Sequence, residues 1–163
     1  MQRLILSFFI LSSFFLKSQD VIEPVKWSFD YVKTNDSIIT LNFKAKIDDK
    51  WHVYSQYIEN EPPLSTIFLF ENEPYKSIQK ITEGKSIISF DPIFNKDLKY
   101  FENLAVFELK IPFNDSLKTI SGLVEYQACD DKLCVFRSEP FTFRFNDGEN
   151  IESITIDNKS VLL

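Results

Sequence analysis

The segment from Tyr126 to Cys134, YQACDDKLC, contains the only two cysteines of the 163-residue chain, Cys129 and Cys134. A pair so placed could form a permanent disulfide that cross-links the fold, or a disulfide that another protein's thiolate opens and that later re-forms. Closing a loop of about six residues stabilises a fold by only roughly 2 kcal/mol. The spacing therefore favours reversible thiol exchange, and a structural bridge stays as the alternative.

Few other residues in the chain could carry a reaction. His52 is the only histidine, and no G-x-S-x-G motif supplies a nucleophile beside it, so we expect an ordinary strand residue. Zinc needs three or four ligands, and His52 and the two cysteines are the only nitrogen or sulfur candidates. We therefore expect no metal and no cofactor.

The residues around the thiols predict their reactivity. Asp130 and Asp131 directly follow Cys129, and nearby negative charge disfavours a thiolate. No cluster of basic residues and no helix N-terminus is evident that would lower the thiol pKa, although Lys132 and Arg137 are close in sequence. We expect a pair that waits for the activated thiol of a partner and acts as a relay, not as a strong oxidant.

Alternating apolar residues predict the elements that hold this pair. From Ser37 to Ile47, every second residue is apolar, which is typical of a strand buried on one face. Many short strands of this kind, separated by turn residues, predict an all-β, immunoglobulin-like β-sandwich. The predicted strands are 25–34, 37–47, 50–56, 65–70, 75–81, 86–90, 101–111, 117–128 and 139–146.

The predicted strands locate the two cysteines and leave one segment that does not alternate. Cys129 follows the predicted strand 117–128, and Cys134 lies beyond a four-residue turn, which places both at the neck of a hairpin. Facing positions there lie about 4.5 to 5.5 Å apart at Cα, within reach of a disulfide. The segment DPIFNKDLKY, residues 91–100, mixes apolar and charged residues, and we expect a loop that folds its apolar side chains onto the domain.

The first eighteen residues have the features of a secretory signal peptide. A basic residue precedes an apolar run from Leu4 to Leu16, which is shorter than the roughly 20 residues of a membrane-spanning helix, and small Ser18 follows. We expect residues 1–18 to be a signal peptide and residues 19–163 to form a single domain without membrane insertion after cleavage. The alternative is that residues 1–18 stay attached as an uncleaved anchor.

The charge of the mature chain excludes one class of partner. Removing residues 1–18, which carry two basic and no acidic residues, takes the formal net charge from −6 to −8. A chain so acidic has no electrostatic footprint for nucleic acid, and we expect no such partner. A domain outside the cytoplasm is also in a compartment where disulfides persist.

Several segments resemble the N-terminal periplasmic domain of the DsbD thiol:disulfide interchange proteins. They are the signal peptide, WHVYSQ at residues 51–56, DPIFNKDLKYFE at residues 91–102, and above all VEYQACDDKLC at residues 124–134. The resemblance covers essentially the whole mature chain, and its specific part is the cysteine segment. One departure is Val135-Phe136-Arg137, where the family commonly has two prolines soon after the second cysteine.

The resemblance implies a periplasmic immunoglobulin-like domain whose two cysteines cycle between disulfide and dithiol. Electrons would come from a membrane electron-transfer protein and pass to or from thioredoxin-like oxidoreductases. Cys134 would form the mixed disulfide with a partner, and Cys129 would resolve it. A cap loop shields the pair in the family, and its aromatic tip corresponds best to Phe94. The alternative is a secreted immunoglobulin-like binding module whose disulfide is permanent.

Overall fold

In the computed structural model, the described residues are 21–58, 62–114 and 116–145. The expected signal peptide, residues 1–18, lies outside them. Among the described residues no helix has the length and apolar character that crossing a membrane requires.

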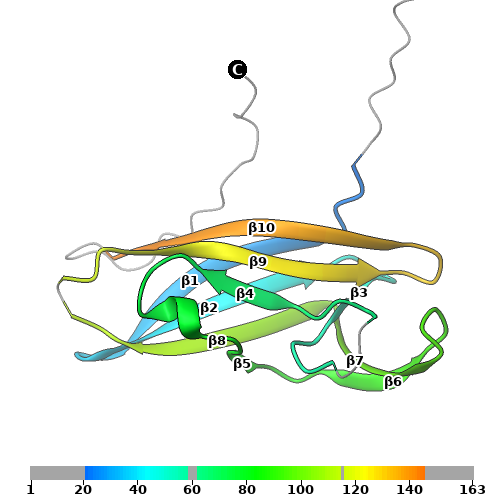
Figure 1. Cartoon of the computed structure of the whole chain (residues 1–163), viewed down its shortest axis with the longest axis horizontal. Coiled ribbons are helices and arrows are strands. Elements are labelled where there is room, and N and C mark those ends of the chain that lie inside the picture. Colours follow the sequence, from blue (N-terminus) through cyan, green and yellow to red (C-terminus); the bar gives the residue numbers. More distant parts are fainter. Residues whose placement is uncertain (1–20, 59–61, 115, 146–163) are drawn as a thin grey trace, which may run out of the picture.

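The described residues form two antiparallel sheets packed against each other (Figure 1). The first sheet has the order β1 (Val25–Asn35), β2 (Ile38–Ile47), β8 (Leu104–Pro112), β5 (Thr82–Glu83). The second has the order β10 (Cys134–Arg144), β9 (Thr119–Cys129), β3 (His52–Tyr54), β7 (Lys96–Glu102), β6 (Ile87–Asp91), and β4 (Ile67–Phe70) also pairs with β9. The predicted all-β, immunoglobulin-like sandwich is confirmed.

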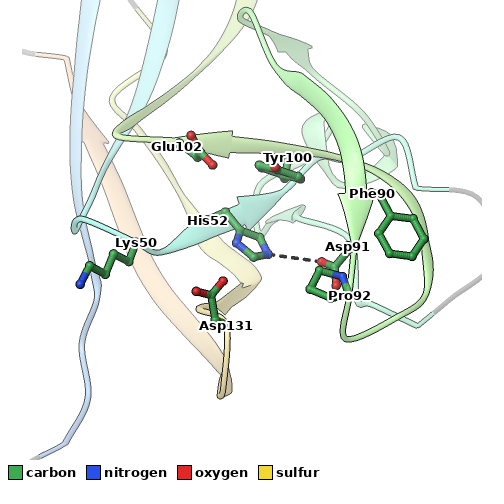
Figure 2. A pocket seen from close by; sticks show the side chains of 8 residues that line it. All are labelled: Lys50, His52, Phe90, Asp91, Pro92, Tyr100, Glu102 and Asp131. Carbon is green, nitrogen blue, oxygen red and sulfur yellow. Dashed lines mark ion pairs between the residues drawn. The ribbon is translucent and has the colours of Figure 1, made fainter.

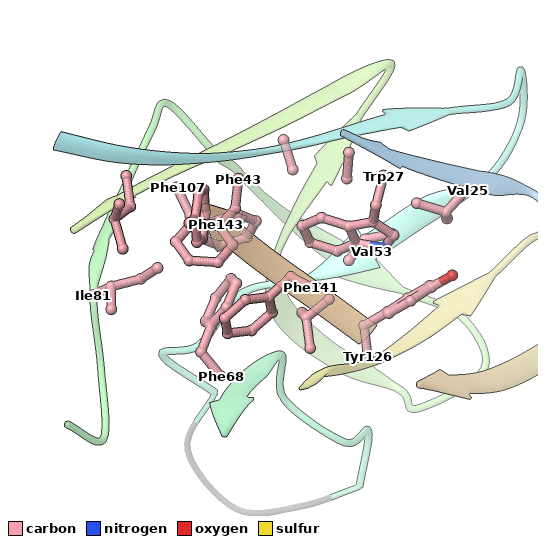
Figure 3. Packing of buried hydrophobic residues seen from close by; sticks show 14 of the residues in the cluster. Val25, Trp27, Phe43, Val53, Phe68, Ile81, Phe107, Tyr126, Phe141 and Phe143 are labelled. Carbon is pink, nitrogen blue, oxygen red and sulfur yellow. The ribbon is translucent and has the colours of Figure 1, made fainter. Parts of the chain in front are cut away.

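Aromatic side chains from both sheets fill the space between them (Figure 3). Phe43 of β2 lies with its ring centroid 4.8 Å from that of Phe68 on β4 and 5.0 Å from that of Phe141 on β10. The ring centroid of Trp27 on β1 lies 5.5 Å from that of Tyr126 on β9. These edge-on and tilted contacts are the geometry that aromatic quadrupoles favour. The core cluster contains neither cysteine, so the sandwich is held together without the sulfur atoms.

One predicted strand is wrong. Residues 75–81 do not form a strand, because Tyr75–Ser77 is a short 3-10 helix, η2, and β5 begins only at Thr82. The backbone N–H groups of Tyr75 and Lys76 both donate to the Asn72 carbonyl, at 2.8 and 3.2 Å. The turn that precedes this segment therefore continues through it and prevents an extended conformation.

The expected loop at residues 91–100 is also wrong in part, because Asp91 ends β6 and β7 begins at Lys96. The two strands form a hairpin whose turn, residues 92–95, we call the cap turn. The sequence of β7 does not alternate between apolar and polar residues, because side chains on both of its faces contact other parts of the domain. Leu98 is buried on one face, and the Lys99 ammonium on the other lies 2.6 Å from the Glu83 carboxylate.

Candidate functional site

Cys129 and Cys134 form a disulfide at the neck of the β9–β10 hairpin. They face each other in register, with their Cα atoms 4.1 Å apart. The Asp130 carboxylate holds the intervening turn by accepting hydrogen bonds from the Lys132 and Leu133 N–H groups, at 2.8 and 2.7 Å. Aspartate commonly forms such turns with its own backbone. The structure thus places the pair where the sequence predicts it.

The two cysteine residues differ in exposure. Cys129 is 0% exposed, whereas Cys134 is only half-buried. The rate of thiol exchange depends on which sulfur an incoming thiolate can reach. Cys134 is therefore the accessible member of the pair.

A second apolar cluster, separate from the main core, surrounds the disulfide. We call it the cysteine cluster; its buried members are Tyr54, Leu98 and Cys129, and Ile58, Phe94, Tyr100 and Cys134 pack against them. Neighbouring residues alternate between the faces of a strand, and Val53 and Ala128 belong to the main core. The cysteine cluster therefore lies on the outer face of the second sheet.

Phe94 reaches this cluster from the cap turn. Its ring packs edge-on against that of Tyr54, with centroids 5.9 Å apart. The Asp91 carboxylate accepts hydrogen bonds from the Ile93 and Phe94 N–H groups, at 2.9 and 3.1 Å, and Asn95 has a positive φ of 53°. Asn tolerates this left-handed conformation better than most residues. Asp91, the last residue of β6, thus holds the cap turn in place, and Phe94 packs in the same cluster as both cysteines.

A polar network that sequence reasoning missed lies next to Cys129. His52 is a strand residue, as expected, but it stands directly opposite Cys129 in the β3–β9 pairing. The Tyr54 hydroxyl donates to the Asp91 carboxylate at 2.6 Å and lies 2.9 Å from His52 Nε2. His52 Nε2 lies 3.5 Å from that carboxylate (Figure 2). Because the single Tyr54 hydroxyl proton goes to Asp91, His52 Nε2 must be the donor to Tyr54.

Burial and hydrogen bonds set the charges of this network. Burial lowers the pKa of His52 below its usual value, although the Asp91 carboxylate acts in the opposite direction. Burial alone would raise the pKa of Asp91, but hydrogen bonds from Tyr54, Phe94 and Ile93 hold it below its usual range. Burial and the bond to Asp91 also raise the pKa of Tyr54. At neutral pH the network therefore consists of a carboxylate, a phenol and a neutral imidazole.

A cleft of about 270 Å³ opens beside the network. Figure 2 shows His52 and Asp91 on its walls, together with Glu102 of β7 and Asp131 of the cysteine hairpin. Among the described residues, no group of three or more histidines, cysteines and carboxylates is arranged to hold a metal ion.

Gln127 is a second residue that sequence reasoning missed. It lies on β9, two residues before Cys129, and its side-chain Nε2 donates to Cys129 Sγ at 3.5 Å. The only sequence signal was its place in the segment YQAC, since a residue two positions away on a strand shares the same face.

The chain matches one family model and resembles solved structures. Residues 18–146 match the family described as "Thiol:disulfide interchange protein DsbD, N-terminal". Among solved structures, the N-terminal periplasmic domain of ScsB from Proteus mirabilis superposes with a TM-score of 0.59 at 9% identity, covering 78% of this chain and 49% of that one. This chain thus spans about half the length of the ScsB structure.

The reduced N-terminal domain of DsbD from Neisseria meningitidis has a TM-score of 0.49 at 13% identity, covering 74% of this chain and 86% of that one. No protein with a curated description matches the sequence.

Proposed function

The chain belongs to the family of DsbD N-terminal domains, and from this premise we propose that it is a periplasmic relay that passes electrons through reversible opening of the Cys129–Cys134 disulfide. The observation that carries the proposal is the asymmetry of the pair: Cys134 is half-buried and Cys129 is fully buried. Both belong to a cluster that includes Phe94 of the cap turn and is separate from the main core. A visiting thiolate would therefore attack Cys134.

The exchange balances without a cofactor. A thiolate of a reduced thioredoxin-like partner attacks Cys134 Sγ, a mixed disulfide forms, and Cys129 leaves as a thiolate that takes up a proton. The partner's second thiolate then attacks the partner sulfur of the mixed disulfide and releases Cys134, which is protonated in turn. Two electrons and two protons enter the domain, and the partner leaves oxidised. The same steps in reverse let the Cys129–Cys134 dithiol reduce a partner disulfide.

The fold supports such a cycle because it does not depend on the bridge. The main core contains neither cysteine, and the disulfide closes a loop already defined by the β9–β10 hairpin. Loss of a bridge with so short a loop lowers the free energy of unfolding by roughly 2 kcal/mol. A domain of this size has the core to remain folded after reduction.

In this proposal Phe94 shields the disulfide from thiols in solution. It packs into the cysteine cluster from the cap turn, so a partner must displace it or pass beside it to reach Cys134. The partners we propose are thioredoxin-like oxidoreductases and a membrane electron-transfer protein of the envelope. The family and the signal-like sequence of residues 1–18 support the periplasmic location.

A redox titration separates this function from a secreted binding module with a permanent bridge. Permanent bridges in secreted proteins typically have reduction potentials below about −300 mV, and labile ones are less negative. We expect the Cys129–Cys134 pair to titrate in the less negative range while the near-ultraviolet circular dichroism of the core stays native. A potential in the permanent range, or unfolding on reduction, would refute the relay.

Trapping in cells tests the assignment of the two sulfurs. Cys129→Ala should accumulate mixed disulfides with envelope proteins through Cys134, visible as bands on a non-reducing gel that a reductant removes. Cys134→Ala is the matched control and should trap far less, because Cys129 is buried. Equal trapping by the two variants would contradict the assignment of Cys134, and no trapping by either would contradict the relay.

A further inference from the structure

The side-chain amide of Gln127 has a defined orientation. The Leu64 N–H donates to Gln127 Oε1 at 2.8 Å, which requires an oxygen at that end of the amide. Exchanging the two amide atoms would place a donor against a donor, so Nε2 must lie on the other side. That side faces Cys129 Sγ at 3.5 Å. Gln127 is thus anchored at its oxygen and presents an N–H to the buried sulfur.

Cys129 is the sulfur that needs such a donor. When a thiolate attacks the accessible Cys134, the electron pair of the broken S–S bond goes to Cys129, which is 0% exposed. A thiolate that develops away from water is costly unless a hydrogen bond or a positive charge stabilises it. The negative charges of the adjacent Asp130 and Asp131 carboxylates disfavour a Cys129 thiolate further.

Two polar side chains near Cys129, Tyr54 of the cysteine cluster and His52 opposite the cysteine, donate their hydrogen bonds elsewhere. The Tyr54 hydroxyl donates its only proton to Asp91. His52 stands opposite Cys129, but its Nε2–H donates to that same hydroxyl. Leu98, the remaining buried member of the cluster, has no polar atom in its side chain. Among the described residues, Gln127 is the side chain whose hydrogen bond to Cys129 Sγ the structure shows.

We propose that Gln127 is a further catalytic residue of the exchange, whose Nε2–H stabilises the Cys129 thiolate as it leaves. In this step the partner sulfur bonds to Cys134 Sγ, the Cys129–Cys134 bond breaks, and the electron pair stays on Cys129 Sγ until a proton arrives. A hydrogen bond to an ionised acceptor is stronger than one to a neutral sulfur, so the contact gains strength as the charge develops. Such preorganised donors act in the transition state.

The proposal rests on the proposed function, because it assigns Gln127 a role only if the disulfide opens through attack at Cys134. The same hydrogen bond has a second consequence in the reduced protein. Stabilising the thiolate lowers the pKa of the Cys129 thiol, which a merely structural contact would not do. The Cys129 thiol pKa therefore reports on the hydrogen bond independently of any reaction rate.

Two variants test the role of the amide. Gln127→Glu keeps an oxygen for the Leu64 N–H but presents a negative acceptor to Cys129 Sγ, and Gln127→Met keeps the length of the side chain without a donor. Glu125→Met, on the same face of β9 but one step farther from the disulfide, is the matched control. We expect Gln127→Met to slow reduction by dithiothreitol about tenfold. A hydrogen bond to a charged group stabilises it by enough free energy to change a rate by at least this factor. Gln127→Glu should slow it further, and Glu125→Met should leave it unchanged.

The thiol pKa is measured from the ultraviolet absorbance of the thiolate in a Cys134→Ala background. We expect the Cys129 pKa to rise in both Gln127 variants and to stay unchanged in Glu125→Met. Unchanged reduction rates together with an unchanged pKa would overturn the inference. If one variant does not fold, the other carries the test, and urea unfolding identifies which one is folded.

The outcome separates the inference from the proposed function. If dithiothreitol reduces the unsubstituted protein, mixed disulfides are trapped through Cys134, and the Gln127 variants behave like it, only the inference about Gln127 fails. If the unsubstituted protein resists reduction while folded, the proposed function fails first.

Discussion

Truncating Phe94 to alanine should open the route to the disulfide. The ring of Phe94 packs edge-on against Tyr54, 5.9 Å between centroids, and belongs to the cluster that contains both cysteines. Removing a fully buried Phe side chain costs about 3–5 kcal/mol, and Phe94 is only half-buried, so the closed cap turn should lose roughly 2 kcal/mol. The hydrogen bonds from Ile93 and Phe94 N–H to Asp91 involve backbone atoms and remain possible after truncation.

The expected effect on the rate follows from this free energy. If reduction proceeds through local opening of the cap turn, destabilising the closed state by roughly 2 kcal/mol raises the open population, and the rate, about thirtyfold. The assay follows reduction by excess dithiothreitol, with quenching by alkylation and counting of alkylated cysteines by mass. Urea unfolding of the oxidised variant shows whether the domain as a whole has stayed stable.

Phe90→Ala is the matched control for this prediction. Phe90 lies in the same hairpin and is 57% exposed, and it is not a member of the cysteine cluster. Its truncation removes a ring that is not part of the proposed cover of the disulfide, so the reduction rate should stay unchanged. An unchanged rate in Phe94→Ala would refute the proposed shield. An equal acceleration in both variants would show that loosening of the hairpin, and not loss of the Phe94 ring, controls access to the disulfide.

Two further predictions concern the sandwich and the network beside Cys129. Gly122→Ala should lower the free energy of unfolding, measured in urea, by about 3 kcal/mol. The added Cβ would lie 2.2 Å from the Leu69 carbonyl oxygen, and overpacking of this kind is costly. Gly84→Ala, whose Cβ would have its nearest atom at 3.2 Å, should lose less stability, and equal losses would contradict the close approach of Leu69 to Gly122. Burial lowers the pKa of His52, so between this pKa and about 6.5 the unfolded chain binds a proton that the folded one does not. The free energy of unfolding should therefore fall as the pH drops below about 6.5, and it should fall more steeply than in His52→Phe. Urea unfolding at several pH values across this window measures both proteins. If the free energy of unfolding depends on pH equally in the two proteins, His52 is not the cause of the loss.

Local pattern was enough to predict the architecture. Period-two alternation such as that from Ile39 to Ile47 marks one buried face of a strand, and this depends only on neighbouring residues. It failed where both faces of a strand have partners, as in β7, and where a turn outcompeted an apolar run, as at Tyr75. The hairpin neck was predictable for the same local reason, because the two cysteines are only five positions apart.

The candidate site beyond the cysteines depended on contacts that sequence spacing does not encode. Tyr54 meets Asp91 across 37 positions, and Leu64 anchors Gln127 across 63. Such pairs form only when the register between distant strands is set, and a one-residue slip would turn each side chain to the other face.

The sequence by itself determined that this chain forms a β-sandwich with a cysteine pair at a hairpin neck, since both follow from short-range alternation and turn chemistry. Only the tertiary structure decided which cysteine is buried, that Phe94 packs in the cluster that contains both cysteines, and that Gln127 donates to Cys129 Sγ. These features arise where strands far apart in the chain meet on the outer face of one sheet, and their positions are set by long-range packing and hydrogen bonds.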